Sequence, residues 1–196
     1  MLKRPALTAL LFTATLVGLT SCSQSAVVTS PTPAGQESVA PSPSLADPSA
    51  PHSVCVDQLG DVTGLDLASA TLTLEPKALN FTITTAAPPA GYAAYDLELV
   101  DNKAQPLYNF SLIFNGSSAI LSGIDFATNE KFPVTPDPQI SGDTVSGKIP
   151  LSDVPHLPPA AVGFQWSANA GGKAGSDRCP DTGSDTTRPA METFPN

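Results

Sequence analysis

Short runs in which apolar and polar residues alternate recur along most of the chain. Residues 79–84 read LNFTIT, with every second position apolar. Side chains at alternate positions of a β-strand point to opposite faces, so this period predicts a strand with one apolar and one polar face. The same alternation occurs in six runs, at residues 70–74, 79–84, 93–99, 108–114, 145–151 and 162–168, and residues 120–126 predict a further strand.

Turn-forming residues separate these runs. Glu75-Pro76-Lys77 lies between the first two and predicts a hairpin, Asn115-Gly116 ends the fourth, and Ser141-Gly142-Asp143 precedes the run over residues 145–151. No segment has a sustained helical period, and residues 153–157 suggest at most a single helical turn. The pattern predicts an all-β fold, an antiparallel immunoglobulin-like or jelly-roll β-sandwich of about seven to eight strands.

The amino-terminal segment has a different character. Lys3 and Arg4 precede an apolar run over residues 6–19, which is typical of a signal peptide over residues 1–21. The run is shorter than the roughly 20 residues that span a bilayer. The sequence Leu19-Thr20-Ser21-Cys22 resembles a bacterial lipobox. The resemblance implies that Cys22 carries a lipid and that the protein is held outside the cytoplasm on the cell membrane. The alternative is an ordinary cleaved signal peptide.

Composition divides the remainder into three parts. Residues 22–53 begin with Cys22 and continue as a Pro-, Ser- and Ala-rich stretch without aromatic residues, which predicts a disordered linker. Residues 54–185 hold the predicted strands and are long enough for one folded domain. Residues 186–196 return to Thr and Pro, and we expect a flexible tail there.

The cysteines and the net charge narrow the range of partners. With Cys22 assigned to lipid, Cys55 and Cys179 remain as an even pair, which favours a disulfide in an exported protein. The alternative is two unpaired buried thiols. The whole chain has a net charge of −9, and loss of Lys3 and Arg4 with the signal peptide would leave 7 basic and 18 acidic residues, or −11. Such a charge repels phosphates and argues against nucleic-acid binding.

Five aspartates lie close in sequence to the two paired cysteines. Asp57, Asp61 and Asp66 follow Cys55, and Asp177 and Asp181 flank Cys179. A disulfide would bring these carboxylates together, and calcium binds six to eight oxygen ligands at about 2.3–2.6 Å. We therefore regard the five aspartates as a candidate Ca²⁺ site. The alternative is ordinary turn chemistry, with the adjacent arginine neutralising part of the charge.

The aspartate motifs also support a resemblance to known domains. An early Asp57-x-x-Gly60-Asp61, a Gly142-Asp143-Thr144-Val145 segment and a closing Asp177-Arg178-Cys179-Pro180-Asp181 resemble secreted bacterial β-sandwiches of the family-9 carbohydrate-binding modules and the related DOMON-type domains. The resemblance covers about residues 54–182. It implies a sandwich fold, whereas the aromatic sugar platform and the haem ligands of those families have no clear counterparts here.

Catalytic motifs are scarce in this sequence. The chain has two histidines, His52 in the linker and His156 in a Pro-rich loop, and it lacks nucleophile-elbow, zinc-protease and phosphate-loop motifs. We expect no catalytic residues, no enzymatic activity and no cofactor beyond the candidate calcium ion. The sequence predicts a membrane-anchored, surface-exposed binding or envelope-structure module that contacts an envelope protein or a glycan. The alternative is a module that binds a carbohydrate or another small molecule.

Overall fold

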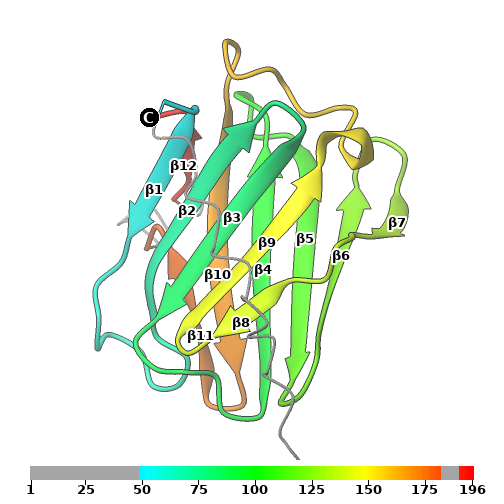
Figure 1. Ribbon diagram of the computed structural model, residues 1–196. Coiled ribbons are helices and arrows are strands. Elements are labelled where there is room, and N and C mark those ends of the chain that lie inside the picture. The colour runs from blue at the N-terminus through cyan, green and yellow to red at the C-terminus, as the bar shows by residue number, and fades with distance from the viewer. Residues whose placement is uncertain (1–48, 182–189) are drawn as a thin grey trace, which may run out of the picture. The chain divides into compact units, whose positions relative to one another are not determined.

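The computed structural model describes residues 49–181 and 190–196, and these form an antiparallel β-sandwich (Figure 1). This part of the chain contains more strands than the seven to eight predicted from alternation. The strands are β1 (His52–Val56), β2 (Leu67–Glu75), β3 (Ala78–Thr85), β4 (Tyr92–Val100), β5 (Pro106–Asn115), β6 (Ala119–Asp125), β7 (Glu130–Pro133), β8 (Gln139–Ser141), β9 (Thr144–Pro150), β10 (Phe164–Gly172), β11 (Gly175–Cys179) and β12 (Glu192–Phe194). A 3-10 turn, η1 (Leu151–Asp153), begins two residues before the helical turn predicted over residues 153–157 and overlaps it at Asp153.

The strands form two sheets that pack face to face. One sheet has the order β1-β2-β3-β9-β8 and faces the viewer in Figure 1. The other has the order β11-β10-β4-β5-β6-β7, with β12 also paired to β10. All the pairings are antiparallel, and the predicted hairpin is formed by β2 and β3. The chain changes sheet after β3, after β7 and after β9.

The core lies between the sheets and is made mainly of apolar positions of the predicted runs, whereas Ile120, Phe126 and Val162 of these runs are exposed. In β4 the buried positions alternate with partly exposed ones, as the sequence predicts. Tyr95, Tyr108 and Trp166 are almost completely buried. Burial of each large apolar side chain contributes about 1.5–3 kcal/mol. Since Trp166 is inside the core, this tryptophan cannot serve as an exposed sugar platform.

The prediction of a flexible tail over residues 186–196 is wrong at its carboxyl end. Glu192–Phe194 forms β12, which pairs with Phe164–Trp166 of β10. The Phe194 ring is fully buried and stacks on Phe164 with ring centroids 4.6 Å apart. Hydrogen bonds from Trp166 Nε1 to Ser53 Oγ and from Ser53 Oγ to the Thr193 carbonyl, each 2.9 Å, link β10, β1 and β12. Ring burial and strand pairing therefore outweigh the polar composition of this segment.

The amino-terminal boundary also differs slightly from the prediction. β1 begins at His52, inside the predicted linker, and Ser53 is buried. The predicted signal peptide, Cys22 and the linker up to residue 48 lie outside the described residues. No helix in the described part of the chain has the length and apolar character to cross a bilayer.

Candidate functional site

The two cysteines predicted to pair form a disulfide. Cys55 lies in β1 and Cys179 in β11, with their Cα atoms 5.9 Å apart. These are edge strands of different sheets. The bridge therefore ties the two sheets together at one side of the sandwich, and it fixes the segments that carry the predicted aspartates.

All five predicted aspartates meet beside this bridge. They form two groups of three, and within each group one carboxylate oxygen from each residue lies within 4.8 Å of the others. The inner triad comprises Asp57, Asp177 and Asp181, and the outer triad comprises Asp61, Asp66 and Asp177. Asp177 belongs to both. Asp57 and Asp177 are buried, whereas Asp61 and Asp181 are exposed, so the cluster runs from the interior to solvent.

Backbone amides hold part of the cluster in place. Asp177 Oδ2 accepts a 2.7 Å hydrogen bond from Leu67 N, and Asp177 Oδ1 accepts one of 2.8 Å from Arg178 N. Asp66 Oδ2 accepts a 2.7 Å bond from Gly60 N. These contacts join β11 to the start of β2 and close the β1–β2 connection. They orient the carboxylates without neutralising them, because each donor is an uncharged N–H group.

Two carboxylate oxygens in the cluster are buried without a hydrogen-bond partner. They are Asp57 Oδ2 and Asp66 Oδ1. Asp57 is only 9% exposed. Burial of polar atoms without a partner is rare in native proteins, because each such group loses its hydration without compensation. An oxygen of this kind next to other carboxylates is therefore a position from which a cation could be bound.

Burial and like charge act together on Asp57. Desolvation, followed by repulsion from the Asp177 and Asp181 carboxylates, raises the pKa of Asp57 from 3.8 to about 7, and a hydrogen bond between the protonated Asp57 and Asp181 adds to the rise. A hydrogen bond from the Gln58 backbone acts in the opposite direction on this pKa but does not compensate. The charged form of Asp57 is therefore disfavoured unless a positive charge lies beside it.

Arg178 does not supply that charge, contrary to the alternative raised from the sequence. Because successive strand residues point to opposite faces, Asp177 turns inward and Arg178 turns outward. Arg178 Nη2 donates to Ser167 Oγ at 2.7 Å and lies 3.4 Å from Glu98 Oε2 and 3.2 Å from the sulfur of Met191. The guanidinium group thus makes its contacts on the outer face of the seven-stranded sheet, away from the aspartate cluster.

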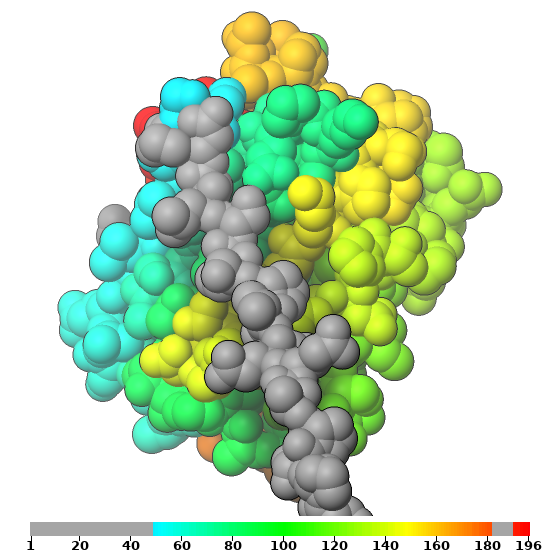
Figure 2. Space-filling view, viewed as in Figure 1, coloured from blue at the N-terminus to red at the C-terminus, as the bar shows by residue number. Residues whose placement is uncertain are grey.

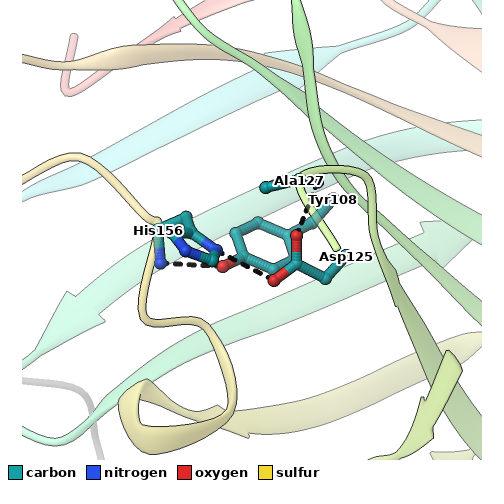
Figure 3. A network of polar contacts seen from close by, with 4 residues as sticks. All are labelled: Tyr108, Asp125, Ala127 and His156. Carbon is teal, nitrogen blue, oxygen red and sulfur yellow. Dashed lines mark hydrogen bonds and ion pairs between the residues drawn. The ribbon is translucent and has the colours of Figure 1, made fainter. Parts of the chain in front are cut away.

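A second polar network, which the sequence did not predict, lies at the opposite edge of the sandwich. Figure 3 shows His156 beside Asp125 and Tyr108. His156 Nδ1 lies 2.9 Å from Asp125 Oδ2, and His156 N donates to the Tyr108 hydroxyl at 2.8 Å. Ala127 N donates to Asp125 Oδ1 at 2.8 Å. The side chain of Asp125 is 8% exposed and that of His156 is 47% exposed. These contacts hold the loop around His156 against the start of β5 and the end of β6.

This network has the contacts of a structural tie. Burial acts to raise the pKa of Asp125, but the hydrogen bonds from His156 and from the Ala127 backbone prevail and lower it. The two side chains border an open hollow of about 470 Å³. The His156 ring contacts Asp125, and the His156 backbone N–H donates to Tyr108, so these contacts join the loop to the sandwich.

Comparison of the chain with protein-family models, with curated proteins and with solved structures finds no match. The resemblance to family-9 carbohydrate-binding modules therefore stays a prediction.

Proposed function

We propose that the protein is a non-enzymatic binding or envelope-structure module, held outside the cytoplasm by a lipid on Cys22. The observation that carries this proposal is the Cys55–Cys179 disulfide. Disulfides persist in oxidising compartments and are rare in the cytosol. The bridge therefore agrees with the destination implied by the lipobox-like Leu19-Thr20-Ser21-Cys22.

The segment between Cys22 and β1 supports the same arrangement. Its Pro, Ser and Ala composition suits a semi-extended spacer between the anchor and the domain. A myristoyl chain alone gives only marginal binding, whereas two or more acyl chains give stable anchoring, since each buried methylene contributes about 0.8 kcal/mol. The partner would then be an envelope protein or a glycan within reach of the spacer.

Metabolic labelling with an alkyne fatty acid tests the anchor. We expect the wild-type chain to take up the label and to fractionate with membranes. Cys22→Ala should lose the label and should not be retained on membranes. A Cys55→Ser/Cys179→Ser double variant is the matched control, because it removes two other cysteines and should keep the label. Mass spectrometry that finds Met1 retained and an unmodified Cys22 sulfur would overturn the proposal.

A carbohydrate or small polar ligand is a second candidate for the binding partner. The outer face of the five-stranded sheet has an open groove of about 400 Å³. Hydroxyl, amide and charged side chains line it, among them Thr71, Thr73, Asn80, Thr82 and Lys148. Such groups are suited to hydrogen-bond a sugar.

A glycan array tests this second candidate. Wild-type binding that is lost in Asn80→Ala, and kept when a residue outside the groove such as Asn109 is replaced by Ala, would favour it. Absence of any array signal, together with protein crosslinks on intact cells, would favour an envelope protein instead.

A further inference from the structure

We propose that the aspartate cluster beside the disulfide is a calcium site, with the ion held by the inner triad of Asp57, Asp177 and Asp181. The outer triad shares Asp177 and adds negative charge next to the ion. This inference does not depend on the lipid anchor or on the identity of the binding partner.

The unpartnered oxygen of Asp57 is the observation that points to a ligand. Asp57 is more than nine-tenths buried, and its Oδ2 has no hydrogen-bond partner. Its nearest acidic neighbours are also acceptors, so they cannot satisfy that oxygen when all three are ionised. A cation within the inner triad would satisfy Asp57 Oδ2 and would offset the repulsion among the three carboxylates.

The spacing of the oxygens fits calcium. Two ligands bound to one calcium ion at about 2.3–2.6 Å lie no more than about 5 Å apart. The oxygens of the inner triad lie within 4.8 Å of one another. Asp181 is exposed, so waters can complete a coordination number of about six to eight. In the space-filling view, the cyan segment through β1 and the β1–β2 connection lies at the margin of the domain (Figure 2), where an ion could enter from solvent.

The donor set argues against other common metals. Zinc in proteins favours histidine nitrogen and cysteine sulfur. Neither triad contains a histidine or a cysteine, and the nearby Cys55 and Cys179 are joined in the disulfide. Magnesium usually keeps several waters and one or two carboxylates instead of occupying a protein cage. A cluster of carboxylates with a buried member is therefore suited to calcium.

The ion would act as a second link between the two sheets. Asp57 follows β1 of the five-stranded sheet, whereas Asp177 lies in β11 of the seven-stranded sheet and Asp181 follows it. The disulfide joins the same two edge strands. Calcium binding should therefore stabilise the folded domain, because the unfolded chain, even with the disulfide intact, lacks the burial and the backbone contacts that hold Asp57 and Asp177 in place.

Thermal unfolding of the purified full chain, with calcium or with a chelator, tests the proposal. In about 5 mM calcium, a concentration that saturates typical extracellular sites, we expect the midpoint to rise by about 5 °C or more. Asp181→Asn, an exposed member of the inner triad, should lose most of this rise. Asp137→Asn is the matched control, since it removes an exposed carboxylate outside both triads and should keep the full rise.

Calorimetric titration of calcium separates the two triads. We expect Asp181→Asn to weaken binding by at least about tenfold, and Asp61→Asn, in the outer triad, to weaken it less. Equal wild-type midpoints in calcium and in chelator would overturn the proposal. A full calcium response in Asp181→Asn combined with its loss in Asp61→Asn would also overturn it. Both variants alter exposed side chains, so a folding failure does not obscure the result, and neither readout depends on where the protein is located.

Discussion

Asp57 and Asp125 are both buried aspartates, and they lie at opposite edges of the sandwich with opposite surroundings. Asp125 receives hydrogen bonds from His156 and from the Ala127 backbone, and its pKa is lowered. Asp57 faces Asp177 and Asp181, keeps an unpartnered oxygen, and has its pKa raised to about 7. Burial alone therefore does not define a functional carboxylate. A buried carboxylate surrounded by hydrogen-bond donors stabilises the fold, whereas one surrounded by other carboxylates is suited to bind a cation.

Removal of the disulfide beside the aspartate cluster should have the largest effect on stability. For Cys55→Ser/Cys179→Ser we expect a loss of about 2–5 kcal/mol in the free energy of unfolding, measured by urea denaturation. The loss should be larger in chelator than in calcium, because the ion would then be the remaining link between the two edge strands. An equal loss in both conditions would show that the bridge and the acidic cluster act independently.

The same chemical change should have opposite effects at the two aspartates. Asp125→Asn replaces a doubly accepting carboxylate with a group that accepts at only one atom, and we expect a loss of about 1–3 kcal/mol in stability. Asp57→Asn removes the desolvation cost of a buried charge and the repulsion from Asp177 and Asp181. In chelator at about pH 8 we therefore expect a gain on the order of 1 kcal/mol in the free energy of unfolding. Urea denaturation of both variants beside wild type measures the difference. Destabilisation of the same size at both positions would contradict the comparison.

The pH dependence of stability should differ in the same way. With calcium chelated, folding raises the pKa of Asp57 from 3.8 to about 7. The resulting contribution to stability is fully present below pH 3.8 and is lost as the pH rises through about 7. Wild-type stability should therefore fall by at least about 1 kcal/mol between about pH 5 and pH 8. Asp57→Asn should abolish this fall.

Asp125 has the opposite sign and a different window. Its lowered pKa contributes stability that is present above 3.8 and is lost as the pH falls below that value. In Asp125→Asn this acid-induced loss should be reduced, while the fall between about pH 5 and pH 8 should persist. If the stability of the wild type in chelator did not change between about pH 5 and pH 8, the raised pKa of Asp57 would be contradicted.

The smallest effect is expected at the half-exposed histidine. His156→Gln should cost about 0.5–1.5 kcal/mol, because Asp125 Oδ2 loses its side-chain partner. His52→Gln is the matched control, since the His52 ring is exposed and lies 3.0 Å from the Ala50 carbonyl. Equal effects in the two variants would mean that the Asp125–His156 contact contributes nothing measurable.

Alternation in the sequence predicted the strands that carry the core, and it missed those whose place depends on pairing. β2 to β5, β9 and β10 read as alternating runs, and β6 overlaps the predicted strand over residues 120–126. β11 (Gly175–Cys179) and β12 (Glu192–Phe194) are short, with few apolar residues. Their strand conformation comes from hydrogen bonding to β10, and for β12 also from burial of Phe194. Neither contact is visible in a local pattern.

The five aspartates and the Asp125–His156 contact also differ in how far the sequence could predict them. The five aspartates could be grouped from the sequence because they adjoin Cys55 and Cys179, and a disulfide turns neighbours in sequence into neighbours in space. Asp125 and His156 are 31 residues apart, with no motif between them. Their contact follows from the packing of the His156 loop against the ends of β5 and β6, which only the folded structure reveals.

The hydroxyl of Ser53 has a consequence for the order in which the chain is made. It accepts from Trp166, 113 residues later, and donates to Thr193, 140 residues later. The bridge at β1 can therefore form only after residues 166 and 193 have been synthesised. Under the export proposed above, a chain whose Ser53 bridge can form only after residue 193 has been made would still be unfolded when it reaches the membrane, and folding would be completed after translocation.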